Sequence, residues 1–142
     1  MHTFGLIFLA ALLLTTATRL WLAARHAAHV RAHRDAVPAQ FADVIALDAH
    51  QRAADYTGAK TRFAMVELLA GVAVTLVLTF GGGLQALHDL SASWFGPGLL
   101  RGLALIAGVA LVTMVIDIPF SLYRTFVIEE RFGFNKMTPK LF

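Results

Sequence analysis

Three long apolar runs constrain the fold of this chain more than any other feature of its sequence. They cover about residues 4–22, 64–84 and 99–120. A helix needs about 20 predominantly apolar residues to cross the roughly 30 Å hydrocarbon core of a bilayer, and each run is long enough. The chain is 58% hydrophobic and only 15% charged, which is rare for a soluble domain of this size. The sequence predicts an all-α, polytopic membrane protein with three transmembrane helices, forming a single membrane domain over residues 1–142.

The distribution of Lys and Arg predicts the orientation of these helices. The connection at residues 25–62 and the tail at residues 121–142 are rich in both, whereas the N-terminus and the second connection have none. The positive-inside rule places the two basic segments in the cytoplasm and the N-terminus outside. It also explains the basic isoelectric point, so no nucleic-acid partner is predicted. The Ala- and Arg-rich composition suggests a bacterial inner membrane.

The first connection contains a further helical pattern. Phe41, Val44, Ile45 and Leu47 fall close to a 3.6-residue period. We expect an amphipathic juxtamembrane helix here, lying on the cytoplasmic membrane surface or packing against the bundle.

Three ionisable residues interrupt the apolar runs at a similar depth. Arg19, Glu67 and Asp117 each lie about three residues inside the cytoplasmic end of a predicted span, or roughly 5 Å. An ionised group costs about 2.5–3.5 kcal/mol at the centre of a spanning helix and less near its ends. We therefore hypothesise an intramembrane polar layer in which Arg19 is a counter-ion for Glu67 or Asp117. The alternative is that Arg19 and Glu67 extend separately to the headgroups.

Two polar blocks stand at the cytoplasmic ends of predicted spans and could meet in space. The first is HQRAADYTGAK at residues 50–60, and the second is TFVIEERFGFNKMT at residues 125–138. With Phe41 and Leu47 ahead of the first block, and Pro119 and Tyr123 ahead of the second, the chain resembles the N-terminal membrane region of the CAAX prenyl endopeptidases. That resemblance covers roughly residues 40–140. It implies structural or docking roles for His50, Gln51, Ala54, Asp55, Tyr56, Thr57, Lys60, Tyr123, Glu129, Glu130, Phe132, Gly133, Asn135, Lys136 and Thr138.

No catalytic or metal-binding residue is predicted in this chain. The endopeptidase family consists of integral-membrane zinc metallopeptidases with a catalytic HExxH motif, and no HExxH occurs here. Glu129 and Glu130 are adjacent and point in different directions on a helix, so they make a poor acid–base pair. His26, His29 and His33 share a helical face but have no obvious carboxylate or fourth ligand beside them. The resemblance implies zinc in the full-length protein only, and the 142 residues alone should be inactive.

Two functions remain open from the sequence. The first is the N-terminal transmembrane portion of a membrane endopeptidase acting on membrane-associated or prenylated CaaX-type proteins. Its partners would be the lipid bilayer, the catalytic part of the same protease and a protein or peptide substrate. We favour it because the chain ends at Leu141 and Phe142, directly after a motif that the family follows with more protein. The alternative is a complete three-span membrane scaffold or regulatory protein without catalysis.

Overall fold

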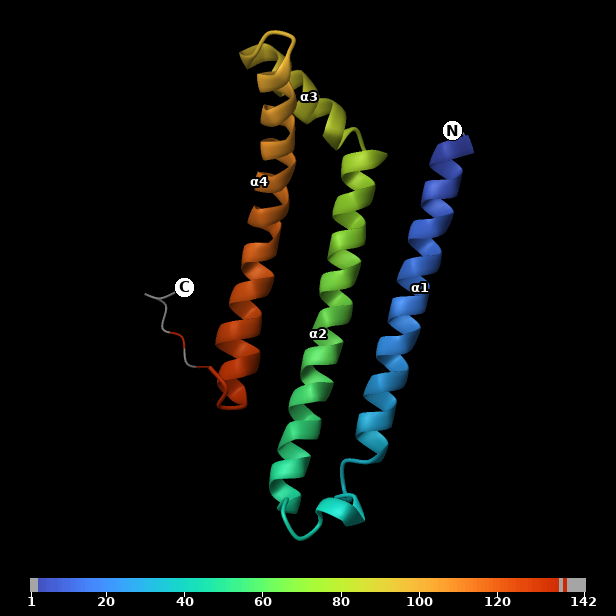
Figure 1. Cartoon of the computed structure of the whole chain (residues 1–142), viewed down its shortest axis with the longest axis vertical. Coiled ribbons are helices and arrows are strands. Elements are labelled where there is room, and N and C mark those ends of the chain that lie inside the picture. The colour runs from blue at the N-terminus through green and yellow to red at the C-terminus, as the bar shows by residue number, and fades with distance from the viewer. Residues whose placement is uncertain (1–2, 136, 138–142) are drawn as a thin grey trace. The chain divides into compact units, whose positions relative to one another are not determined.

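The computed structural model describes residues 3–135 and 137, and every regular element in that part of the chain is helical. The elements, shown in Figure 1, are α1 (Thr3–Ala32), η1 (Ala39–Phe41), α2 (Leu47–Thr79), α3 (Gly83–Trp94), α4 (Leu99–Tyr123) and the π-helical η2 (Arg124–Glu129). Three helices are long and apolar enough to cross a membrane: α1, α2, and α4 continued through η2. The predicted all-α architecture with three candidate membrane spans is confirmed.

The first two long helices extend well beyond their apolar runs. α1 has 30 residues and α2 has 33, which correspond to about 45 and 50 Å at 1.5 Å per residue. Both lengths exceed the roughly 30 Å of hydrocarbon. The surplus lies where α1 and α2 approach their connection, so the whole first polar block is part of α2. Its side chains therefore stand on a continuous helix and have fixed angular positions.

The amphipathic helix expected from Phe41 is absent, and this prediction was wrong. Phe41 ends the single turn η1, where its N–H donates to the Pro38 carbonyl at 2.8 Å. Residues 42–46 form a turn and a bend, and Leu47 already belongs to α2. Residues 33–46, between α1 and α2, thus contain only the single turn η1 as a regular element. A short helix forms instead in the second connection, as α3.

Three consecutive glycines end α2 earlier than the expected limit of the second span at residue 84. Gly82 has a φ of 79°, which L side chains rarely adopt. A Cβ at Gly81 would lie 2.7 Å from the Val77 carbonyl oxygen, and a Cβ at Gly83 would lie 2.9 Å from the Leu78 Cα. All three positions thus favour glycine, and α3 begins directly after the turn.

The chain divides into two compact units. The first comprises Met1–Leu69 and Tyr123–Phe142, and the second comprises Ala70–Leu122. Within the second unit α3 approaches α4 closely, because a Cβ at Gly108 would lie 3.3 Å from a Leu87 methyl group. The single membrane domain remains a prediction.

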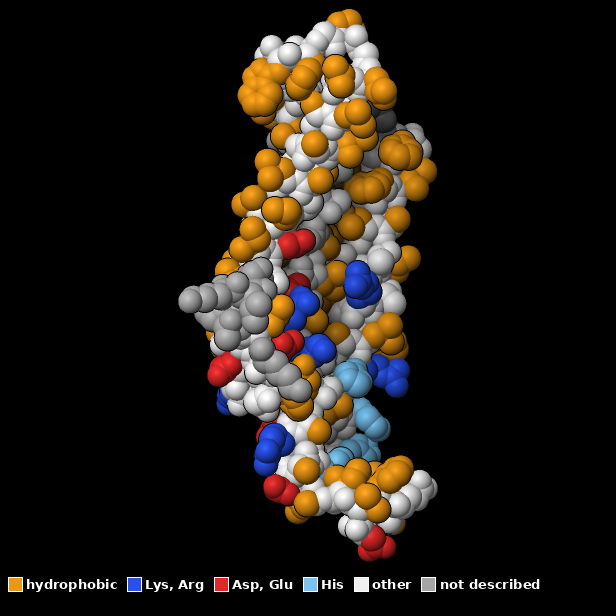
Figure 2. Space-filling view, turned by 60° about the vertical axis from the view of Figure 1, so that its left-hand side comes forward, with side chains coloured by type: hydrophobic (Ala, Val, Ile, Leu, Met, Phe, Trp, Pro, Cys, Tyr) orange, Lys and Arg blue, Asp and Glu red, His pale blue; other side chains and the backbone are white. Residues whose placement is uncertain are grey.

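Most large apolar side chains lie on the outside of the helices. Ile128 is the one buried hydrophobic residue among those the structure describes, whereas Phe4 and Leu99 are more than three-quarters exposed. Figure 2 shows hydrophobic side chains spread over the visible helical surface, with charged and His side chains gathered near the end where α1 and α2 are joined. This distribution suits helices whose solvent is lipid, so the protein is a multi-pass membrane protein.

We expect Gly82→Ala to destabilise the fold by about 1–2 kcal/mol, because alanine pays a steric cost in the left-handed region. Thermal unfolding in detergent micelles, followed by circular dichroism, measures the effect. Gly96→Ala is the matched control, since a Cβ there meets no heavy atom within 4 Å. Equal stability of the two variants would contradict the requirement at Gly82.

Candidate functional site

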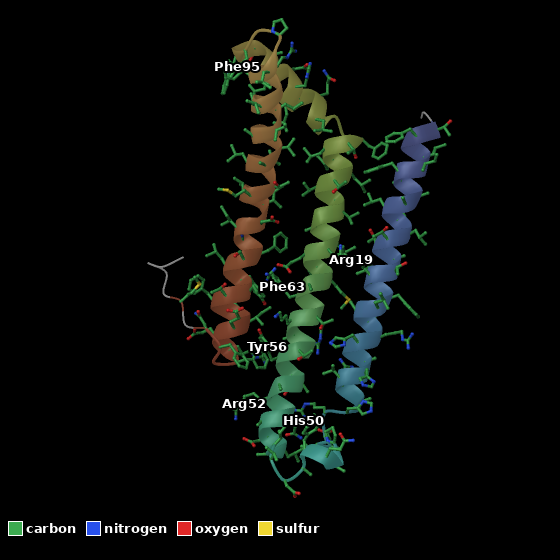
Figure 3. All side chains as sticks on the ribbon, in the orientation of Figure 1. Arg19, His50, Arg52, Tyr56, Phe63 and Phe95 are labelled. Carbon is green, nitrogen blue, oxygen red and sulfur yellow. The ribbon has the colours of Figure 1, made fainter. Side chains whose placement is uncertain are left out.

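The two polar blocks meet through an aromatic contact within the first compact unit. The Tyr56 ring of α2 lies 5.4 Å from the Phe132 ring and 4.7 Å from the Phe134 ring, measured between centroids. These distances are typical of favourable aromatic pairs. Tyr56 lies on the side of α2 that faces the C-terminal helical segment (Figure 3). The contact joins segments that lie more than 70 residues apart in the sequence.

Two further contacts continue along the same face of α2. The Phe63 ring stacks on Tyr123 with a centroid distance of 4.9 Å, and the Arg124 guanidinium donates a hydrogen bond to the Glu67 carboxylate. Tyr56, Phe63 and Glu67 are separated by seven and then four residues, which places them on one helical stripe. We refer to Tyr56, Phe63 and Glu67 as the α2 stripe.

Sequence reasoning missed Phe63 and Arg124. Phe63 could have been found from its helical spacing, because it lies seven residues after Tyr56 and four before Glu67, on the same side of α2. The partner of Glu67 could not be read in this way, because Arg124 lies at the junction between α4 and the π-helical segment η2. A π-helix has about one more residue in each hydrogen-bonded turn than an α-helix. The direction in which successive side chains point therefore shifts at this junction.

The helical part of the second block ends in a turn that directs Phe134 back towards α2. Gly133 has a φ of 76°, its N–H donates to the Glu130 carbonyl, and the Phe134 N–H donates to the Glu129 carbonyl at 2.9 Å. This pair of bonds around a left-handed glycine is a Schellman helix end. The Asn135 amide also donates to the Glu130 carboxylate at 2.8 Å. Glu129 and Glu130 thus take part in forming this turn.

The beginning of the first block is tied to the end of α1. Arg34 donates two hydrogen bonds to the Asp55 carboxylate, at 2.7 and 2.8 Å, and a further one to Asp35. The Gln51 amide donates to Asp35, and a His50 ring nitrogen donates to the His33 carbonyl at 2.9 Å. The bonds to Asp55 and Asp35 raise the pKa of the Arg34 guanidinium above its ordinary value. Asp55, Gln51 and His50 therefore hold the α1–α2 connection in place.

The remaining residues of the first block interact within α2 or are half-buried. The Thr57 hydroxyl donates to the Ala53 carbonyl within α2, Ala54 is half-buried, and the Lys60 ammonium lies 5.6 Å from the centre of the Tyr56 ring. Lys136 and Thr138 lie outside the described residues.

Two of the α1 histidines lie close together. The His29 and His33 rings lie 4.2 Å apart, and the described part of the chain contains no group of three or more His, Asp or Glu residues that could hold a metal ion.

Glu67, a member of the predicted polar layer, has a partner that the sequence did not predict. Glu67 pairs with Arg124, and the Glu67 side chain is only 22% exposed. Asp117 belongs to the second compact unit. The role of Arg19 as a counter-ion for Glu67 or Asp117 stays a prediction.

Comparison with known families decides where the chain belongs. Residues 26–142 match a family model described as CAAX prenyl protease N-terminal, five membrane helices. The chain is a member of this family. The described residues contain three candidate membrane spans, fewer than the five of the family description.

Individual relatives agree with this assignment. The chain is 32% identical over 122 residues to "Probable CAAX prenyl protease 1" of Schizosaccharomyces pombe, covering 77% of this chain and 26% of that protein. It is 31% identical over 146 residues to "CAAX prenyl protease 1 homolog" of Mus musculus, covering 96% of this chain and 30% of that protein. The chain therefore spans about a third or less of these curated relatives.

A solved structure shares the fold. The crystal structure of S. mikatae Ste24p superposes with a TM-score of 0.88 at 22% sequence identity, covering 99% of this chain and 33% of that chain.

The aromatic contact predicts a stability effect at Tyr56. We expect Tyr56→Ala to lower the free energy of unfolding by about 1–3 kcal/mol, because it removes two aromatic pairs worth about 0.5–1.5 kcal/mol each. Tyr56→Phe keeps the ring and should remain within about 0.5 kcal/mol of the parent chain. Denaturation with SDS in mixed micelles, followed by circular dichroism, measures both. An equal loss in the two variants would show that the hydroxyl matters more than the ring contacts.

A double-mutant cycle tests the pairing of Glu67 with Arg124. We expect Glu67→Gln and Arg124→Gln to show a coupling free energy of about 1–3 kcal/mol, because either change alone leaves a charge unpaired near lipid. The exposed helical pair Arg52–Asp48 is the control and should couple by no more than about 0.5 kcal/mol. Additive effects at Glu67 and Arg124 would contradict the pairing.

Proposed function

We propose that this chain forms the N-terminal transmembrane portion of a zinc-dependent membrane endopeptidase that hydrolyses membrane-associated or prenylated CaaX-type proteins. The observation that carries the proposal is the packing of the two family motifs on each other, through Tyr56 with Phe132 and Phe134. The family match and the relatives named as CAAX prenyl proteases supply the reaction class.

The geometry supports a positioning role rather than a catalytic one. Asp55 is engaged by Arg34, Glu67 by Arg124, and Glu130 by Asn135. A carboxylate held by a cation or an amide is poorly placed to accept a proton from water. The motif residues thus form a cytoplasmic surface that these contacts stabilise, and the catalytic part of the same protease can dock on it.

Zinc hydrolysis then depends on residues outside these 142. A zinc peptidase of the HExxH type needs two His one turn apart, a third ligand and a Glu that activates water. The sequence has no such motif, so zinc belongs to the catalytic part of the longer protein. This chain by itself is inactive.

The orientation follows from charge. Lys and Arg gather in the α1–α2 connection and in the tail, which puts both motifs on the cytoplasmic side and the N-terminus outside. The composition suggests the inner membrane of a bacterium.

The size of the native polypeptide tests the proposal. An antibody against residues 26–60 should detect, in membranes of the source organism, a band much larger than the 15.4 kDa of this chain. That protein, once purified, should contain zinc and hydrolyse a prenylated CaaX peptide, and chelation should abolish the hydrolysis. The purified 142-residue chain should do neither.

A band at 15.4 kDa would overturn the protease proposal and favour a three-span scaffold that binds a partner. A larger protein with bound zinc that cleaves other membrane proteins, but not CaaX peptides, would retain the protease and overturn the substrate class.

A further inference from the structure

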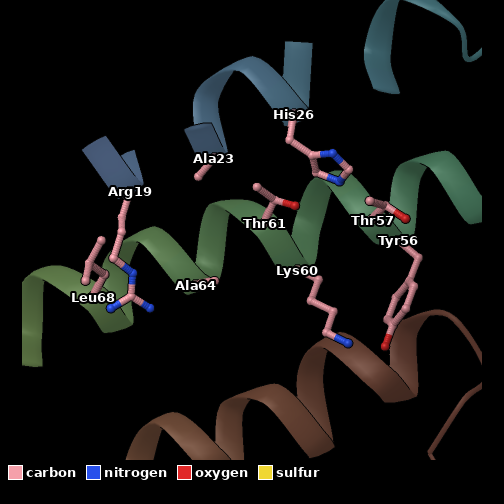
Figure 4. A pocket seen from close by; sticks show the side chains of 9 residues that line it. All are labelled: Arg19, Ala23, His26, Tyr56, Thr57, Lys60, Thr61, Ala64 and Leu68. Atoms are coloured by element: carbon pink, nitrogen blue, oxygen red, sulfur yellow. The ribbon is translucent and has the colours of Figure 1, made fainter. Parts of the chain in front are cut away.

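A cavity of about 460 Å³ lies between α1 and α2 within the first compact unit. Arg19, Ala23 and His26 line it from α1, and the other lining residues come from α2 (Figure 4). The lining residues are Arg19, Ala23, His26, Tyr56, Thr57, Lys60, Thr61, Ala64 and Leu68. The cavity is separate from the contacts that hold Glu67 and Phe63.

The polar part of the lining consists of hydrogen-bond donors and positive charges. Arg19 and Lys60 are cationic, and the hydroxyls of Thr61 and Tyr56 can each donate a hydrogen bond, whereas the Thr57 hydroxyl already donates to the Ala53 carbonyl. No Asp or Glu lines the cavity. In the part of the chain that the structure describes, neither Arg19 nor Lys60 forms a salt bridge. Such a lining attracts an anion with several acceptor oxygens, and a phosphate group has this chemistry.

The rest of the lining is apolar and extends towards the membrane. Ala23, Ala64 and Leu68 line the cavity together with the polar groups, and Leu68 lies beside Arg19 at one end in Figure 4. From Thr57 to Leu68 the α2 backbone advances about 16 Å, which is far longer than a single phosphate ion. Both helices continue from here into their apolar runs. An elongated molecule with a phosphate head and a hydrocarbon tail fits this arrangement better than a small anion.

We propose that this cavity binds an anionic phospholipid, with Arg19 and Lys60 attracting its negatively charged headgroup into the space between α1 and α2 and the start of an acyl chain along Ala64 and Leu68. The bound lipid occupies the groove between α1 and α2 and keeps the two helices together. Arg19 thus has a role independent of any carboxylate partner. The site does not depend on the protease proposal, because it lies wholly in residues of this chain.

The test compares two charge-matched double variants of the 142-residue chain in detergent micelles. Arg19→Gln with Lys60→Gln removes one cation from each helix inside the cavity, and Arg31→Gln with Arg52→Gln removes one from each helix outside it. The probes are dioctanoyl phosphatidylglycerol, dioctanoyl phosphatidylcholine and inorganic phosphate, with dissociation constants measured by thermophoresis. We expect the cavity pair to weaken phosphatidylglycerol binding about tenfold or more, and the outside pair less than about twofold.

A third variant protects the test against loss of folding. Arg19→Lys with Lys60→Arg keeps both charges and should retain phosphatidylglycerol binding within about threefold, with unchanged helicity by circular dichroism. Equal weakening by the cavity pair and the outside pair would overturn the site in favour of general surface charge. Inorganic phosphate that binds as tightly as phosphatidylglycerol, or phosphatidylcholine that binds equally well, would overturn the anionic-lipid assignment.

Discussion

The packing of Tyr56 against Phe132 and Phe134 is the interaction on which the arrangement of the two motifs depends. A tyrosine on a continuous helix has a fixed direction, so the C-terminal segment must turn back to reach it. Gly133 makes that turn possible, because its positive φ costs a glycine little. Phe63 and Tyr123 repeat the same kind of contact two helical turns further along α2. Aromatic packing thus brings together the parts of the sequence that resemble the family most closely.

Polar groups near the membrane are organised around this aromatic packing. Glu67 lies one turn beyond Phe63 on the α2 stripe and is engaged by Arg124, next to Tyr123. The same register that stacks the aromatic rings therefore also brings a carboxylate to a guanidinium. A charge left alone at this depth is costly, so the pairing and the packing support each other. At the opposite end of the first block, the two-pronged contact of Arg34 with Asp55 fixes the start of α2 to the end of α1.

The residues of the two motifs contact two different parts of the chain. Side chains of the first block point in two directions, towards the α1–α2 connection and towards the C-terminal segment. Those of the second block form a helix end and its aromatic face. Asp55, Tyr56 and Phe132 each contact another part of this chain, which gives them a structural role.

The sequence by itself determined the class of fold and the number of candidate membrane spans. Apolar runs of about 20 residues permit few structures in lipid other than spanning helices, so composition and length predicted α1, α2 and α4. The sequence could also place both motifs at matching ends of the spans. It could not give the helix limits, because polar residues extend a helix as readily as apolar ones once it has formed. The prediction of a separate helix from Phe41 was also wrong. Only the tertiary structure decided that Glu67 meets Arg124 and that Tyr56 meets Phe134. Those contacts depend on the π-helical turn at residues 124–129 and on the backbone angle of Gly133, and neither produces a periodic signal in the sequence.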